Sequence, residues 1–292
     1  MPMTGNLRSI LAMLAAMGSF SLMDAVLKTL SGSYPSMQVA ALRGLASLPL
    51  VCLYVAWRRE VHLLLRVRWP LHLLRGVLGI AMLALFSFSL RELGLAEAYT
   101  IFFVSPLIIT VLAIPVLQER VSGRHWAAIA VGLCGVVVAL RPDQDAFFSL
   151  GAVAVLVAAA FYAISAIAGR VLSRTDAAVT LVFWTTAMWA VGASVLAWPA
   201  WVPVQAAHGS LLVALAVTGF LGQLAITEAF RHGNASAVAP FEYSALAWAI
   251  LLDFTIWHIV PDAYTLVGGA IIIGSGIYLI RREKVRDIAV PP

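Results

Sequence analysis

Three of the ionisable side chains inside the long apolar segments, where a charge is costly, are candidates for function. Asp24 and Arg43 fall within the first two segments, and Glu242 falls within the ninth. A charge at the centre of a bilayer costs about 2.5–3.5 kcal/mol on insertion scales, so each residue is a candidate for ligand binding or coupling. Asp24 could be neutralised by Lys28 one turn away or by Arg43, while Arg43 could attract a carboxylate. Glu242 could bind a proton or an ammonium group, or contact polar neighbours.

Aromatic and small polar side chains inside the same segments form a second candidate group. Rings that face a shared space, with a few polar contacts among them, make a typical small-molecule site of broad specificity. The alternative is that these rings face lipid or pack between helices. The candidate lining residues are Phe20, Phe86, Tyr99, Phe102, Ser105, Tyr162, Ser165, Trp184, Gln223, Glu242, Tyr243 and Ser244.

Motifs for catalysis or nucleotide hydrolysis are absent from the sequence. It contains no HExxH, GxSxG or P-loop pattern, and its six histidines are scattered. Cys52 and Cys134 lie in apolar segments, as expected for small packing residues. We therefore expect no enzyme, no catalytic residue, no metal and no cofactor, and any energy must come from a gradient.

Composition indicates a polytopic membrane protein. Apolar residues make up 62% of the 292 residues and charged residues only 11%, against about 25% charged in soluble proteins. The net charge of +5 resides in the gaps between apolar runs, which indicates membrane topology and not nucleic-acid binding.

Apolar runs of about 20 residues predict an all-α protein with ten transmembrane helices. Most of the 19 Lys and Arg residues fall in the connections on one side, which predicts that both termini are cytoplasmic. The predicted helices cover residues 7–29, 36–57, 71–91, 96–117, 123–141, 148–171, 178–199, 209–230, 236–258 and 263–281. Two pairs of small residues predict close helix packing, namely Ala128 with Gly132 and Ala270 with Gly274.

The chain contains an internal duplication. The Gly-x-Ala-x-Ala that begins at Gly94 returns at Gly233, and Phe102 corresponds to Phe241 under the same shift. Residues 1–141 and 148–292 then hold five helices each. An odd number of crossings inverts the second copy, an arrangement that recurs in secondary transporters with alternating access.

Two prolines in corresponding stretches are candidate hinges. Pro106 interrupts the backbone hydrogen bonds of the fourth predicted helix, and Pro240 lies near the start of the ninth. Static kinks are an equally economical interpretation.

Ten spans, two five-helix halves, the repeated Gly-x-Ala-x-Ala and a basic C-terminus resemble the drug/metabolite transporter superfamily, in its EamA group. Within that group the chain looks like the YddG-type amino-acid exporters. The resemblance implies one integrated transport domain with a site between the halves. It also implies broad-specificity export of neutral and aromatic amino acids across the bacterial inner membrane, by a monomer or homodimer. Alternatives are an exporter of another small metabolite or drug, or a channel.

Overall fold

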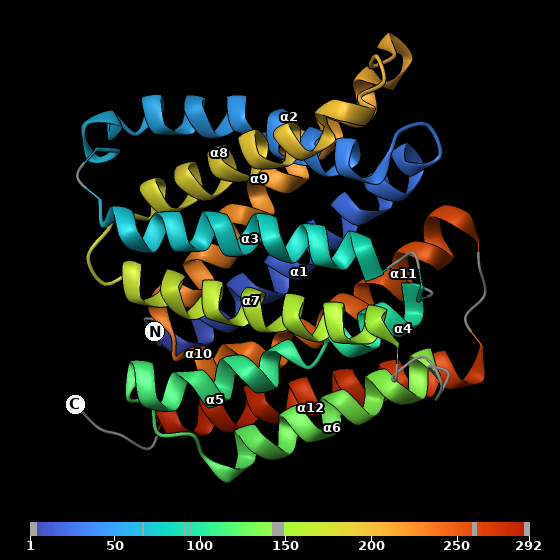
Figure 1. Cartoon of the computed structure of the whole chain (residues 1–292). Helices are drawn as coiled ribbons and strands as arrows, with labels where there is room; N and C mark the ends of the chain where they lie inside the picture. The colour runs from blue at the N-terminus through green and yellow to red at the C-terminus, as the bar shows by residue number, and fades with distance from the viewer. Residues whose placement is uncertain are drawn as a thin grey trace.

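The structure is a computed structural model that is all-helical throughout its described residues (Figure 1). The predicted boundary between the halves, within residues 142–148, lies outside these residues, as do both chain ends. The described residues are 5–65, 67–89, 92–93, 95–141, 149–258 and 262–288.

Eight long helices are continuous in the described chain, and each overlaps a predicted span. Nine stretches of the described chain are long and apolar enough to cross a membrane, and α12 adds a shorter apolar stretch. The long helices are α1 (Gly5–Ser31), α2 (Ser36–Trp57), α3 (Trp69–Ser89), α6 (Gly123–Leu140), α7 (Leu150–Leu172), α8 (Ala178–Ala197), α9 (Gly209–His232) and α12 (Ala263–Ile288). Short 3-10 helices occupy connections: η1 (Val61–Leu63), η3 (Trp198–Ala200) and η4 (Ala206–His208).

The fourth and ninth predicted helices each consist of separate helical segments, and the interruption of the fourth lies beside Pro106, as predicted. Pro106 lies in the first turn of α5, and Pro240 lies in the first turn of η5. A proline is tolerated there because the first turn of a helix has no backbone acceptor for its missing N–H. The fourth span consists of α4 (Leu95–Phe102) and α5 (Ser105–Leu117); the ninth consists of α10 (Ala235–Val238), η5 (Ala239–Tyr243) and α11 (Ser244–Trp257).

The helix contacts follow a two-fold exchange of the halves. The pair α1 and α9 has its counterpart in α7 and α3, and the pair α5 and α7 has its counterpart in α11 and α1. The pairs α2 with α8 and α6 with α12 map onto themselves. This is the contact pattern that two inverted repeats require. Figure 1 also places the start of α1 and the end of α12 at the same end of the bundle, which we call the terminal end.

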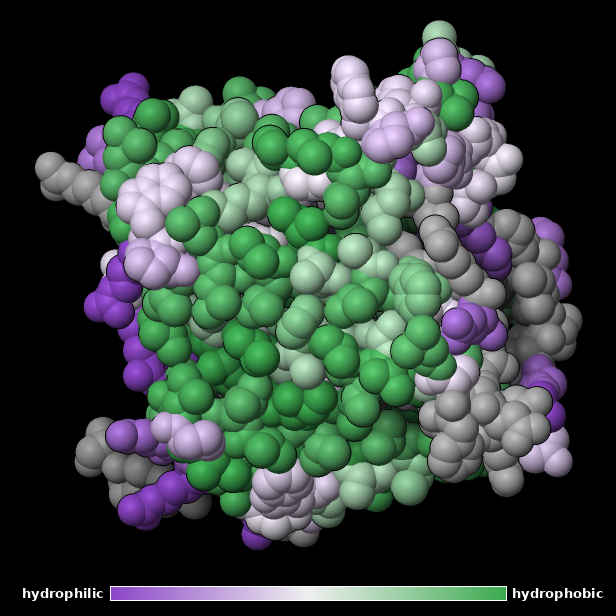
Figure 2. Space-filling view, viewed as in Figure 1, coloured by the Kyte–Doolittle hydropathy of each residue, from purple (hydrophilic) through white to green (hydrophobic). Residues whose placement is uncertain are grey.

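The surface between the two ends is apolar. Figure 2 shows a broad hydrophobic face, with polar side chains gathered toward the ends of the bundle. Leu53, Val191 and Val195 are each more than half exposed. Such a belt is unfavourable in water and favourable in hydrocarbon, as expected for a membrane-spanning bundle.

The carboxylate of Glu119 joins the two halves at the terminal end, and we call its hydrogen bonds to the start of α10 the latch. Glu119, just after α5, accepts hydrogen bonds from the backbone N–H groups of Ala235 (2.8 Å) and Ser236 (3.0 Å). The Ser236 hydroxyl donates a third bond to it at 2.7 Å, and Asn6 accepts a bond from the N–H of Asn234. The first turn of α10, which offers free N–H groups, is thereby tied to both α5 and α1.

Close packing of α6 against α12 depends on small residues, although not on all of those predicted. A Cβ on Gly268 would lie 2.4 Å from the Gly135 carbonyl oxygen and 2.7 Å from the Ala139 nitrogen. Gly132 faces the ring of Tyr243, whereas nothing lies within 4 Å of a Cβ on Gly274. The predicted packing role of Gly274 was therefore wrong.

Gly268 and Gly274 form a matched pair on one helix for a stability test. Gly268→Ala would force a methyl group against backbone atoms, so we expect it to destabilise the protein by about 1–3 kcal/mol. Gly274→Ala should leave the melting temperature unchanged or slightly raised, because Ala favours helix. Thermal unfolding of both variants in detergent checks this. Equal melting temperatures would contradict the backbone contact.

Candidate functional site

Arg43 is held between two aromatic rings at the centre of the bundle. Its guanidinium carbon lies 5.3 Å from the ring centroid of Phe20 on α1 and 5.2 Å from that of Trp189 on α8. Cation–π contacts of this kind stabilise a planar guanidinium away from water. The half-buried Arg43 also interacts electrostatically with Asp24.

Asp24 faces the interior of the bundle, although its side chain is exposed. On a helix it lies about 200° around the axis from Leu22, which is an exposed apolar residue. Phe20, one turn earlier on the same face, is the ring that carries Arg43. The exposed surface of Asp24 therefore lies on the Arg43 side of α1, and the charge of Arg43 acts on it.

A chain of aromatic rings connects the first half to the second. Phe86 on α3 contacts Tyr99 (5.5 Å between centroids) and Phe102 (5.7 Å) on α4. Phe102 contacts Tyr162 on α7 at 5.6 Å. The Tyr162 hydroxyl donates a hydrogen bond of 3.1 Å to Glu242 in η5. The broken fourth and ninth spans thus meet through Phe102, Tyr162 and Glu242.

Glu242 is a buried carboxyl group with a neutral donor. Only 5% of the residue is exposed, and Tyr162 is its hydrogen-bond donor among the described residues. An ionised carboxylate in such surroundings is stable only with a cation or further donors, and otherwise takes up a proton. Glu242 can therefore hold either a proton or a cationic group of a ligand.

Four smaller candidates lie around this group. Ser105 begins α5 and is 1% exposed, while Ser165 is half-buried one turn after Tyr162. Gln223 follows Gly222, whose Cα faces the Phe20 ring. The Ser244 hydroxyl is buried at the start of α11 and has no hydrogen-bond partner in the described part of the chain. It is a polar group available to a ligand in the broken ninth span.

The structure places Trp184, a predicted lining residue, away from the central group, whereas Tyr243 is joined to that group through Phe103, which contacts Tyr99 at 6.4 Å between ring centroids. The Trp184 indole N–H donates to the carbonyl of Leu64 at 2.9 Å, and its ring contacts Trp69 at 4.7 Å. Tyr243 is 1% exposed and packs against Phe103 in the contact with α6. Trp184 anchors a connection, and Tyr243 fills the core.

Trp189, which was not among the predicted lining residues, is the tryptophan of α8 that contacts Arg43. Gly79 makes room for it, because a Cβ there would lie 2.1 Å from the indole nitrogen. The position of each tryptophan along α8 could have distinguished the two. Trp184 is nearer the start of the helix, where tryptophans at the membrane interface are expected.

Comparison with known proteins identifies the family. The sequence model of the EamA-like transporter family matches residues 7–141 and 149–282. A solved crystal structure superposes with a TM-score of 0.80 at 21% identity, covering 97% of this chain and 99% of the other, and so shares the fold.

Three curated relatives are similar over nearly their whole length. The pseudopaline exporter CntI of Pseudomonas aeruginosa is 29% identical, covering 94% of this chain and 96% of the relative. The S-adenosylmethionine uptake transporter of Rickettsia conorii is 26% identical (93% and 92%), as is the riboflavin transporter of Vibrio cholerae (95% and 94%).

These relatives are transporters and not enzymes, and their substrates differ. The finer resemblance to YddG-type amino-acid exporters is not what they show. The two family matches together cover most of the sequence, in two copies. The chain belongs to the EamA-like transporter family, and it is a multi-pass membrane protein that carries small metabolites by secondary transport.

Proposed function

We propose that this transporter exports small zwitterionic metabolites, with neutral and aromatic amino acids among its substrates. The observation that carries the proposal is Arg43, held by Phe20 and Trp189 beside the exposed Asp24. A guanidinium in this position is suited to a carboxylate, to which it can donate two parallel hydrogen bonds. Asp24 or Glu242 would accept an ammonium group, and the rings around Phe102 would take an apolar side chain.

The two halves act as one transport domain in this proposal, with residues 1–141 and 148–292 as repeats. Asp24 and Arg43 come from the first repeat, and Tyr162, Trp189 and Glu242 come from the second. A site shared between repeats can be opened to either side by exchanging their conformations. We place both termini in the cytoplasm of a bacterium, at the inner membrane, from the distribution of Lys and Arg, and we propose a monomer or homodimer.

The breaks in the fourth and ninth spans are the proposed hinges. Pro106 lies at the start of α5 and Pro240 at the start of η5. The segments α5 and α11 begin at Ser105 and Ser244, which correspond under the shift that pairs Gly94 with Gly233. At such a break the chain can bend without losing a regular ladder of hydrogen bonds. A hinge at each break predicts that the segments beyond it, next to Glu119 and Asn234, separate when the site opens at the terminal end.

The main alternative is a different small metabolite, carried in either direction. It is favoured by the relatives, which include a pseudopaline exporter, an S-adenosylmethionine uptake transporter and a riboflavin transporter. A channel is a weaker alternative, because inverted repeats allow a site between them to open to one side at a time, which a carrier needs and a channel does not.

Counterflow in proteoliposomes tests both the substrate class and the role of Arg43. We expect vesicles preloaded with unlabelled neutral or aromatic amino acids to accumulate the labelled amino acid saturably. Arg43→Gln should reduce kcat/KM about 10- to 100-fold, the value of a lost charge-assisted hydrogen bond. Arg124→Gln, an exposed arginine at the start of α6, is the matched control.

Three outcomes would contradict the proposal. Amino acids that show no counterflow, while S-adenosylmethionine or riboflavin exchanges, would assign a different substrate. Equal kcat/KM in Arg43→Gln and Arg124→Gln would show that Arg43 is structural. A non-saturating flux would instead indicate a channel.

Glu242→Gln tests whether the carboxyl group couples transport to protons. Gln keeps the size and an acceptor for Tyr162 but cannot be deprotonated, so we expect exchange to persist while uptake driven by a pH gradient is lost. Tyr162→Phe should weaken uptake without abolishing its pH response, because the carboxyl group remains. The measurement is proteoliposome uptake with and without an imposed pH gradient. If Glu242→Gln keeps the full response to the gradient, the proton-coupling role is wrong.

A further inference from the structure

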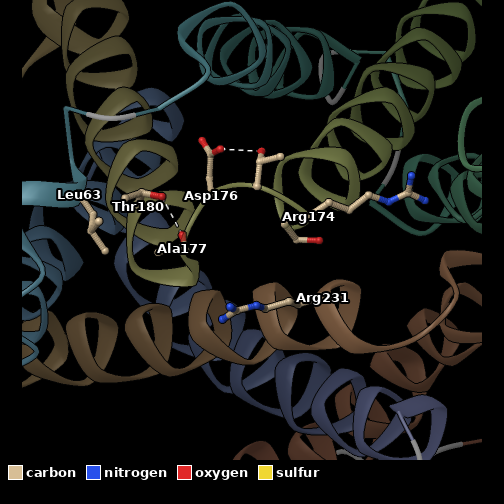
Figure 3. A pocket seen from close by; sticks show the side chains of 8 residues that line it. Leu63, Arg174, Asp176, Ala177, Thr180 and Arg231 are labelled. Carbon is tan, nitrogen blue, oxygen red and sulfur yellow. Dashed lines mark hydrogen bonds between the residues drawn. The ribbon is translucent and has the colours of Figure 1, made fainter.

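A second hollow lies outside the central site, at the terminal end of the bundle. It has a volume of about 300 Å³ and lies between η1, the connection from α7 to α8, and the end of α9 (Figure 3). Leu63, Asp176 and Arg231 each line one part of it. Figure 3 shows the Arg231 side chain reaching from α9 toward Ala177, whereas Arg174 extends away along α7.

Arginine side chains around this hollow have more donors than the protein satisfies. Arg231 is only loosely paired with Glu228, at 3.7 Å, because Glu228 has shorter contacts with Arg8 (3.1 Å) and His232 (2.8 Å). Arg170 lies outside the lining, where it donates to the carbonyl of Arg231 and interacts electrostatically with Glu119; its Nε is buried with no hydrogen-bond partner in the described residues. Within the lining, the loosely paired Arg231 is the group that favours an anionic ligand.

The acid in the lining, Asp176, does not meet this demand. Its Oδ2 accepts from the ring of His72 (3.0 Å) and from the N–H of Arg68 (3.2 Å), and its Oδ1 accepts from Thr175 (2.7 Å). Burial alone raises the pKa of Asp176, but the bonds from Thr175, His72 and Arg68 lower it below its ordinary value overall. The carboxylate is therefore ionised, and it is occupied by partners other than Arg231.

The segment beside the hollow places it at the depth of lipid headgroups. At the end of α2 and in its connection to α3, the apolar side chains of Trp57 (76% exposed), Val61 (56%) and Leu65 (75%) face outward next to the exposed Arg58 and Arg59. Exposed Trp and aliphatic residues mixed with arginines are typical of the membrane–water interface. Leu63 of this same segment lines the hollow, so a lipid beside it can reach the arginines.

We infer that this hollow binds the phosphate of an anionic phospholipid headgroup. Basic pockets between helices at the cytoplasmic side are suited to such headgroups. Arg231 contacts the phosphate directly, Arg174 and Arg170 add positive charge, and the acyl chains lie along the apolar surface beside Leu65. The bound lipid joins α7, α8 and α9 at the terminal end. The inference does not depend on the substrate of the central site.

Thermal unfolding of the purified full-length protein in mixed micelles tests this site. We expect phosphatidylglycerol to raise the melting temperature saturably, whereas phosphatidylcholine raises it little. Arg231→Gln should require about fivefold more phosphatidylglycerol for half of the effect, since one arginine near an anionic surface contributes roughly that factor. Arg174→Gln should show a smaller change in the same direction. Arg124→Gln, which lies outside the hollow, should titrate like the wild type.

Three results would overturn the inference. Arg231→Gln and Arg124→Gln with the same midpoint would show that the stabilisation arises elsewhere. Equal stabilisation by phosphatidylcholine would show that the headgroup charge is irrelevant. An equal effect of inorganic phosphate at the same concentration would assign the site to a free anion and not to a lipid. If Arg231→Gln does not fold, the phosphatidylglycerol midpoint of Arg174→Gln is compared with that of Arg124→Gln, and equal midpoints would overturn the inference.

Discussion

The central constraint on this structure is that a guanidinium must be kept inside an apolar bundle. Arg43 lies two turns into α2, where water is scarce and an isolated charge is expensive. Phe20 and Trp189 cover its two sides, and each ring reaches it only because a glycine leaves room: Gly222 beside Phe20 and Gly79 beside Trp189. Two glycines from different repeats thus support one charge. A ligand carboxylate would further stabilise the guanidinium by pairing with its charge.

The polar groups of the interior gather where the backbone is irregular. Glu242 and the unpaired Ser244 hydroxyl lie in the broken ninth span, and Phe102 ends α4 at the break in the fourth. Irregular backbone at membrane depth is tolerated only where it is buried in protein or lines a cavity. Placing the breaks in corresponding positions of the repeats puts flexible backbone and ligand-binding groups in the same region, and this is what alternating access requires.

The positions of the helices could be predicted from the sequence, but the way they meet could not. Apolar runs of about 20 residues determine the spans, because a helix that crosses the hydrocarbon core must be predominantly apolar over that length. The interruption of the fourth span was predicted from Pro106, and Pro240 was placed near the start of the ninth; interrupted segments in corresponding stretches are a known pointer to a transporter site. Asp24, Arg43 and Glu242 were selected because ionisable side chains are rare in such segments, and Tyr162 was selected as an aromatic residue within a span.

The errors have physical causes as well. Trp184 and Trp189 both lie on α8, and their depth along the helix separates an indole that anchors a connection from one that contacts Arg43. Gly274 matched a packing pattern, yet the closest backbone approach to α6 occurs at Gly268, because helix rotation is set by contacts in three dimensions. The hollow near Arg231 could not be predicted for the same reason, since its walls come from two separate connections and the end of α9.

The distance between the two segments joined by Glu119 tests the account most directly. Spin labels at Gln118 and Asn234, both exposed, would be introduced after Cys52 and Cys134 are replaced by Ser, and pulsed electron spin resonance would measure their separation in lipid nanodiscs. The account predicts two populations, a short one with the latch closed and a longer one with the terminal end open, and Glu119→Gln should enrich the longer one. A single narrow distance, identical in the wild type and in Glu119→Gln, would contradict alternating access by movement of the two halves.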